Sequence, residues 1–161
     1  MPQHVNSEIS TVVIDDDKAI ADNLDDYLIK KGYSSYKAYT GQQGMELVDA
    51  KRPHIALVDF KLPDINGIDL LKSIKTNSPE TIVIFITGYA TIDAAAEAIR
   101  YGAFDFIAKP FKFDELDQLL HRAIETKTQT KKSKQLKKRR IILILTIPIW
   151  MLLGYLFFRL F

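Results

Sequence analysis

Acidic, hydroxyl and basic residues follow short apolar runs at four separate places in this chain. Asp15 and Asp16 follow TVVI, Asp59 follows IALV, Thr87 follows IVIFI, and Lys109 follows FDFIA. Carboxylates brought together repel one another unless a cation compensates, and hard oxygen ligands of this kind suit Mg²⁺. An aspartate can also attack a phosphoryl group while Mg²⁺ and an ammonium neutralise the phosphoryl oxygens. These residue types therefore predict a magnesium site suited to phosphoryl transfer.

The pattern between these residues predicts the elements that position them. We expect strands at Ser10 to Ile14, Ser34 to Ala38, Ile55 to Val58, Ile82 to Ile86 and Phe104 to Ala108, and helices at Ala19 to Lys31, Gly41 to Ala50, Ile68 to Thr76, Thr91 to Tyr101 and from Phe113 onward. Five strand-then-helix units indicate an α/β fold, a doubly wound five-stranded parallel sheet with helices on both faces. The carboxyl ends of parallel strands share one edge, where ligands bind. The acidic, hydroxyl and basic residues should meet there, except Asp17, which we expect to cap the first helix.

Charge and composition narrow the classes of function. Nine of the 22 Lys and Arg residues, but none of the 20 Asp and Glu residues, lie after residue 125, so residues 1–125 carry a net charge of −7. This charge argues against DNA binding by the globular part, because phosphate contacts need cations. The chain has no cysteine, which excludes disulfides and thiolate chemistry.

Four motifs, VVIDDDKAI, LVDFKLPDING, VIFITGYA and AFDFIAKPF, occur in the order and spacing of a known family. Over residues 9–125 they resemble the receiver domain of bacterial two-component response regulators, which has a flavodoxin-like fold. The resemblance implies that Asp59 accepts phosphate from a sensor histidine kinase or a histidine phosphotransfer protein. The chain would then be a phosphoacceptor that promotes its own phosphotransfer and dephosphorylation, and not an enzyme acting on other substrates.

The resemblance also implies the parts of the site. Asp16 and Asp59 would ligate Mg²⁺, with Asp15 acting largely through water, and the backbone carbonyl of Lys61 would complete the protein ligands. Thr87 would bond the phosphoryl group and Lys109 would pair with it. The family pattern further implies a cis peptide bond between Lys109 and Pro110, and an aromatic switch at Phe106 that moves with Thr87. A readout surface is expected to include Ala94, Ala98, Tyr101, Phe106 and Phe111, which is compatible with a partner protein or a phosphorylation-dependent dimer.

The last residues predict a membrane anchor. Residues 141–158 form an uncharged run of 18 residues, which as a helix would cover roughly 27 Å, close to the hydrocarbon thickness of a bilayer. We therefore divide the chain into an N-terminal extension (1–8), a receiver domain (9–125), a basic linker (126–140) that attracts anionic lipid, and a transmembrane helix (141–161). The positive-inside rule places the receiver domain on the cytoplasmic side of the cytoplasmic membrane, as a single-pass protein.

No DNA-binding or enzymatic effector sequence follows the receiver motifs, so we expect signalling through a separate output protein, at the membrane. Three alternatives stay open. The chain can be a phosphate sink or phosphorelay intermediate, a regulatory subunit of a membrane complex, or an aspartate-nucleophile phosphatase. The phosphatase needs a second aspartate two residues after the nucleophile, where this chain has Lys61. A gene broken after its receiver sequence is a further possibility. The order of a basic run followed directly by an apolar run argues against it.

Overall fold

The computed structural model describes residues 9–88 and 91–129. Residues 1–119 form one compact unit and residues 120–161 another, of which 120–129 are described and helical. The elements in chain order are β1 (Ser10–Ile14), α1 (Lys18–Lys30), β2 (Ser34–Ala38), α2 (Gly41–Lys51), β3 (Ile55–Val58), α3 (Gly67–Asn77), β4 (Ile82–Thr87), α4 (Ile92–Arg100) and β5 (Asp105–Ala108), followed by a helix described over 113–129.

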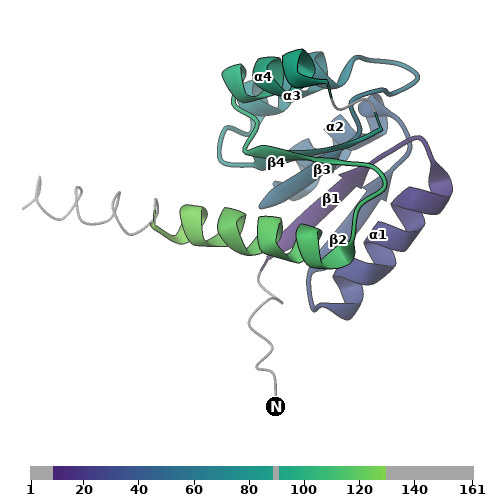
Figure 1. The fold of residues 1–161 in the computed structure, drawn as a ribbon, viewed down its shortest axis with the longest axis vertical. Helices are drawn as coiled ribbons and strands as arrows, with labels where there is room; N and C mark the ends of the chain where they lie inside the picture. Colours follow the sequence, from purple (N-terminus) through teal and green to yellow (C-terminus); the bar gives the residue numbers. More distant parts are fainter. Residues whose placement is uncertain (1–8, 89–90, 130–161) are drawn as a thin grey trace, which may run out of the picture. The chain divides into compact units, whose positions relative to one another are not determined.

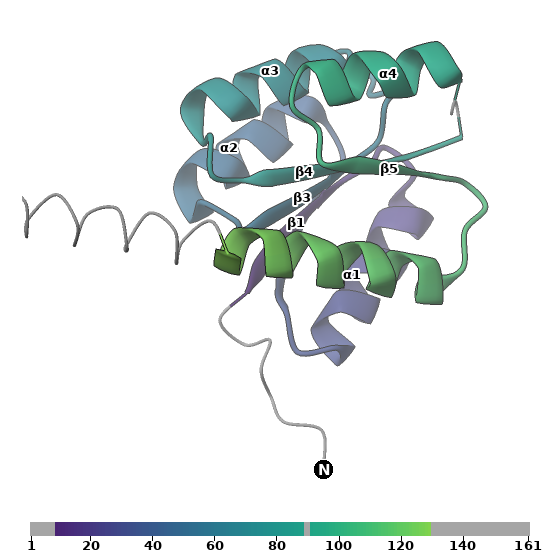
Figure 2. The ribbon, with the colours of Figure 1, turned by 60° about the vertical axis from the view of Figure 1, so that its left-hand side comes forward.

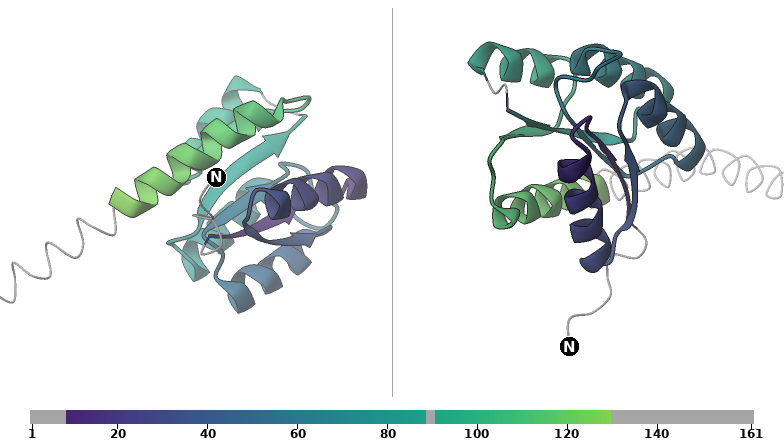
Figure 3. Two further views of the ribbon diagram at one scale, coloured as in Figure 1. Left: turned by 90° about the horizontal axis from the view of Figure 1, so that it is seen from below. Right: turned by 90° about the vertical axis from the view of Figure 1, so that its right-hand side faces the viewer.

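The five strands form one parallel sheet in the order β2-β1-β3-β4-β5 (Figure 1). Helices α2, α3 and α4 cover one face, while α1 and the start of the helix after β5 cover the other (Figure 2). Figure 3 shows the same two helical layers from two further directions. The predicted doubly wound α/β fold is therefore confirmed for the described residues.

The central strands are buried on both faces, which explains their nearly continuous apolar sequences. Every residue of β3 is buried, as are the last four residues of β1 and the last five of β4. Val12 and Ile14 of β1 belong to the core cluster on the α2 and α3 side, so the alternate residues Thr11 and Val13 face α1. The strand alternation thus assigns each side chain to one of the two layers.

Helix starts follow capping residues in the sequence. Asp17 accepts hydrogen bonds from the backbone N–H groups of Ala19 and Ile20, which confirms its predicted role as the N-cap of α1. Thr40, Asn66 and Thr91 cap α2, α3 and α4 in the same way. Most of the predicted boundaries agree to within one residue; β4 runs one residue further than expected because Thr87 still pairs with Ala108 in the ladder.

The predicted membrane anchor, residues 141–161, lies outside the described residues, as does most of the basic linker. Residues 126–129, which open that linker, are helical. Within the ranges 9–88 and 91–129, no helix has both the length and the apolar character needed to cross a bilayer.

Candidate functional site

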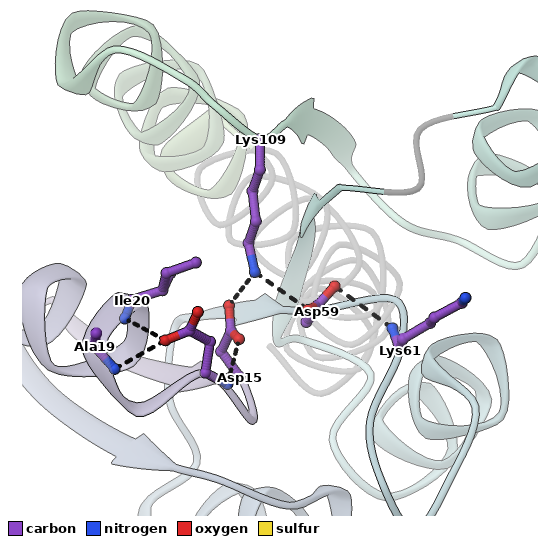
Figure 4. Close-up of polar contacts among 7 residues, drawn as sticks. Asp15, Ala19, Ile20, Asp59, Lys61 and Lys109 are labelled. Carbon is purple, nitrogen blue, oxygen red and sulfur yellow. Dashed lines mark hydrogen bonds and ion pairs between the residues drawn. The ribbon is translucent and has the colours of Figure 1, made fainter.

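The carboxyl ends of three strands bring a lysine and two carboxylates together. Asp15 follows β1, Asp59 follows β3 and Lys109 follows β5, as the sequence predicted. The Lys109 Nζ atom lies 2.5 Å from Asp15 Oδ2 and 3.2 Å from Asp59 Oδ2. Figure 4 shows the ammonium reaching down between the two carboxylates. The edge of the sheet therefore carries a compact anionic site with one cation already inside it.

Backbone hydrogen bonds that continue the strand ladders hold these residues in place. The N–H of Asp15 donates to the Ala38 carbonyl at 3.1 Å, and the N–H of Asp59 donates to the Ile14 carbonyl at 2.8 Å. On the other side, the N–H of Lys109 donates to the Thr87 carbonyl at 2.9 Å. The Lys109–Pro110 peptide bond is cis, as the family resemblance implied. The functional side chains thus start from the rigid sheet and not from free loops.

The three carboxylates near the edge are placed where one cation can reach them all. Oxygen atoms of Asp15, Asp16 and Asp59 lie within 4.8 Å of one another. The oxygen-only donor set and its small span fit Mg²⁺, which takes few protein ligands. Asp17 lies outside this set, because its side chain caps α1. Its backbone N–H instead donates to Asp15 Oδ1 at 3.0 Å and so fixes the orientation of that carboxylate.

Burial and charge act against each other in this site. Burial raises the pKa of Asp15 above its usual 3.8, against the lowering effect of the Lys109 ammonium. Burial also disfavours the Lys109 cation, but its bonds to Asp15 and Asp59 outweigh this cost and raise the pKa of Lys109 above 10.5. The lysine therefore stays charged at neutral pH.

A family comparison identifies the chain. The profile of the "Response regulator receiver domain" matches residues 11–121, which is more than half of the sequence. The chain belongs to the response regulator receiver family. Members of this family act in two-component signalling, are phosphorylated on an aspartate by histidine kinases or phosphotransfer proteins, and bind Mg²⁺ through acidic residues, and this chain carries such an acidic cluster.

Individual relatives show the same relationship. The chain is similar to the sporulation initiation phosphotransferase F of Bacillus subtilis, with 32% identity over 73% of this chain and 94% of that protein. It is 31% identical to the regulatory protein AtoC of Escherichia coli K12 over 78% of this chain, but spans only 27% of AtoC. A CheY-like receiver domain from Methanospirillum hungatei superposes with a TM-score of 0.70 at 30% identity, covering 75% of this chain and 98% of that one.

Two further parts of the receiver site lie near Asp59. The backbone N–H of Lys61 is 3.5 Å from Asp59 Oδ1, and Lys61 forms an isolated bridge with Asn66. This bridge shapes the loop that carries Lys61, whose carbonyl remains a predicted magnesium ligand. The loop also supports α2, because Asp64 accepts hydrogen bonds from the backbone N–H groups of Gly41 and Gln42, both at 2.8 Å. This cap between distant segments could not be predicted from the sequence, where its one signal is the acidic residue in LPDING.

The predicted switch residues lie around a small apolar cavity. Thr87 is buried, whereas the Phe106 side chain on the edge strand β5 is 38% exposed. Both line a cavity of about 10 Å³ under α4, together with Phe60, Phe85, Ala94, Ala95 and Ala98. The positions of Thr87 and Phe106 are compatible with a coupled movement, which stays a prediction.

The predicted readout surface needs one correction. Ala98 is buried in the core and cannot contribute to a surface, and Ala94 is half-buried. The exposed large apolar residues of α4 are instead Ile92, at 88% exposure, and Ile99, at 48%, and Tyr101 after the helix is 40% exposed. The inward stripe of α4 is made of alanines because it packs closely on the sheet, which leaves the larger isoleucines outside.

Gly67 provides a close approach that shapes the Asp59 loop. A Cβ atom at this position would lie 2.8 Å from the Phe60 carbonyl oxygen and 2.9 Å from that of Asp59, both backbone atoms. We expect Gly67→Ala to lower the free energy of unfolding by about 1–3 kcal/mol, because the loop must move. Urea unfolding of the full chain measures this change. Gly88→Ala is the matched control, since its Cβ would meet nothing within 4 Å; equal effects of the two variants would contradict the steric argument.

Proposed function

We propose that this receiver accepts a phosphoryl group on Asp59 from the phosphohistidine of a histidine kinase or phosphotransfer protein, and signals through a partner protein at the membrane. One observation carries the choice of acceptor. Lys109 contacts both Asp15 and Asp59, but Asp15 is 2% exposed in its side chain, with one oxygen on Lys109 and the other on the Asp17 N–H. Asp59 is 12% exposed, and its Oδ1 atom makes a long contact of 3.5 Å with the Lys61 N–H. Of the two carboxylates that Lys109 contacts, Asp59 is therefore the one that an incoming phosphoryl group can reach.

The reaction needs a nucleophile and neutralised charge. A carboxylate oxygen of Asp59 attacks the phosphorus, the phosphorus–nitrogen bond breaks, and its electron pair returns to the imidazole of the donor histidine, which leaves an acyl phosphate on Asp59. Asp15, Asp16, Asp59 and the Lys61 carbonyl would hold Mg²⁺, which when bound neutralises charge on the phosphoryl oxygens. The Lys109 ammonium supplies a second positive charge, and the Thr87 hydroxyl donates to a phosphoryl oxygen. Water later hydrolyses the acyl phosphate, so the chain acts on its own phosphoryl group and not as an enzyme on other substrates.

The magnesium requirement tests this reaction. We expect phosphorylation of the full chain by phosphoramidate to slow by about 10²-fold or more when EDTA removes divalent cations. Because burial raises the pKa of Asp15 above 3.8, protons should compete with Mg²⁺ at a higher pH than for an exposed carboxyl group. Magnesium affinity, measured by calorimetry, should therefore be highest near pH 7 and should fall as the pH decreases through the pKa of Asp15. Equal phosphorylation with and without EDTA would contradict the proposal.

The exposed apolar residues of α4 support a protein partner for output. Ile92, Ile99 and Tyr101, with Phe106 on β5, are large apolar side chains that face solvent. Such groups favour contact with another protein surface. The occupant we propose is the output protein, and a phosphorylation-dependent second copy is the other partner that this surface would fit.

Membrane anchoring is the second part of the proposal, and it rests on the apolar sequence 141–161 after the basic run. We expect the full chain to stay in the membrane pellet after an alkaline carbonate wash, whereas a chain that stops after Arg140 should be released. Immunoblots of the pellet and the supernatant measure the distribution. If both chains are soluble, the anchor and the cytoplasmic-membrane location are wrong, while the phosphotransfer proposal is unaffected.

A phosphorelay intermediate is the alternative that one comparison favours. The chain covers 94% of the Bacillus subtilis protein named sporulation initiation phosphotransferase F. A relay member passes its phosphoryl group on to a second histidine protein and needs no output surface. Rapid back-transfer from the phosphorylated chain to a histidine phosphotransfer protein would favour this role. Slow back-transfer, combined with loss of signalling in an Ile92→Ser variant that is still phosphorylated, would favour the output role.

A further inference from the structure

Three buried oxygen atoms that the site described above does not use lie on neighbouring elements. Among the residues that the structure describes, Thr11 Oγ1, Asp25 Oδ1 and Ser35 Oγ are buried side-chain oxygens with no hydrogen-bond partner. They come from β1, α1 and β2, three elements that pack against one another (Figure 1). A buried polar group without a partner is costly, so most such groups in folded proteins bond to the protein or to an ordered water molecule.

The strand register places two of these atoms side by side. Thr11 of β1 pairs with Ser35 of β2 in the parallel ladder, so their side chains leave the same face of adjacent strands. This face is the α1 side, because Val12 and Ile14 point into the core cluster on the opposite face. Within the described residues, the two hydroxyl groups are nevertheless not hydrogen-bonded to each other, so each of them needs another partner.

The third atom comes from α1 and faces the same layer. Asp25 is buried together with Ala21, Leu24 and Leu28, which form the inward stripe of α1. Its Oδ2 atom lies 3.7 Å from the Nζ atom of Lys37, which is two residues beyond Ser35 on the same face of β2. Lys37 lies closer to Asp22, at 2.8 Å, so Asp25 shares this cation with Asp22. With Oδ2 directed at Lys37, the remaining oxygen is the one that is buried without a partner.

We propose that an internal water molecule binds between α1 and the β1–β2 pair, where it donates to Asp25 Oδ1 and accepts from the hydroxyl groups of Thr11 and Ser35. Water satisfies this set, because internal waters make about three hydrogen bonds to polar groups that would otherwise have no partner. The bound water would tie the middle of α1 to β1, the strand that Asp15 follows. The site is independent of the phosphotransfer proposal.

Isosteric substitutions in the full chain test this site by the sign of their effect. If the water is present, Thr11→Val and Ser35→Ala should each raise the equilibrium constant of unfolding about two- to tenfold in urea titrations, because each removes a hydrogen bond. In the double variant, the equilibrium constant of unfolding should rise by less than the product of the two single increases, since both hydroxyls bond the same water molecule. Ser34→Ala is the matched control, because Ser34 is the exposed neighbour on the same strand, and it should leave stability unchanged.

Four results would overturn the proposal. If Thr11→Val leaves the stability unchanged or increases it, the hydroxyl makes no bond, because replacing a polar group without a partner by a methyl is neutral or stabilising. Strictly multiplicative effects would show that the hydroxyls do not share one molecule. A stability that changes when potassium chloride replaces sodium chloride at the same ionic strength would identify a bound cation in place of water. In a crystal structure, an ordered water within hydrogen-bond distance of Asp25 Oδ1 and one of the hydroxyls would support the site, and direct bonds among the three side chains would exclude it.

Discussion

Replacement of Asp59 by asparagine should abolish phosphorylation of the full chain. The amide keeps the shape of the side chain but lacks the anionic oxygen that attacks the phosphorus, so we expect the rate to fall by about three orders of magnitude or more. The fold should survive, because the change removes one of the carboxylates that repel each other around Lys109. Phosphate incorporation from a radiolabelled histidine kinase or from phosphoramidate measures the rate.

Asp69→Asn is the matched control for this variant. Asp69 lies in the first turn of α3, is exposed, and pairs with the neighbouring Lys72 at 3.2 Å. Its variant should be phosphorylated at the rate of the unchanged chain. If Asp59→Asn is still phosphorylated at a comparable rate while it remains folded, another residue is the acceptor.

Replacement of Lys109 by glutamine should separate catalysis from metal binding. The variant loses the ammonium that neutralises the phosphoryl group, so phosphorylation should slow by about 10²–10³-fold. The same ammonium competes with Mg²⁺ for Asp15 and Asp59, which it contacts at 2.5 and 3.2 Å. Magnesium affinity, measured by calorimetry, should therefore rise or stay the same in the variant while the rate falls.

Lys112→Gln gives the control for Lys109→Gln, because Lys112 is exposed and lies three residues further along the chain. It should change neither the rate nor the magnesium affinity. If Lys109→Gln loses magnesium binding together with phosphorylation, the lysine mainly maintains the structure of the site, and its proposed part in the chemistry is wrong.

The fold could be predicted from the sequence because each strand is a short apolar run bounded by polar or turn residues. The predicted bounds of β1, β2 and β3 agree with the structure residue for residue. The edge that carries Asp15, Asp59 and Lys109 followed from the rule that parallel strands end on one side of a sheet. The site was thus predictable because its residues directly follow the strands.

Features that depend on packing between distant segments could not be predicted in this way. In α4, apolar residues lie on both the inward and the solvent-facing side of the helix. Periodicity alone could therefore not show that Ala98 is buried while Ile92 is exposed. The bonds from Asp64 to the start of α2 join residues more than 20 positions apart in sequence. The unpartnered oxygens of Thr11 and Ser35 become visible only with the strand register and the burial of each atom.

Mapping the phosphorylated residue tests the central claim most directly. The phosphorylated full chain is reduced with borohydride, which converts an acyl phosphate of aspartate into homoserine, and the modified peptide is identified by mass spectrometry. The proposed mechanism predicts homoserine at position 59 only, and only when Mg²⁺ was present during phosphorylation. Homoserine at position 15 or 16, or phosphate on a residue other than aspartate, would contradict it.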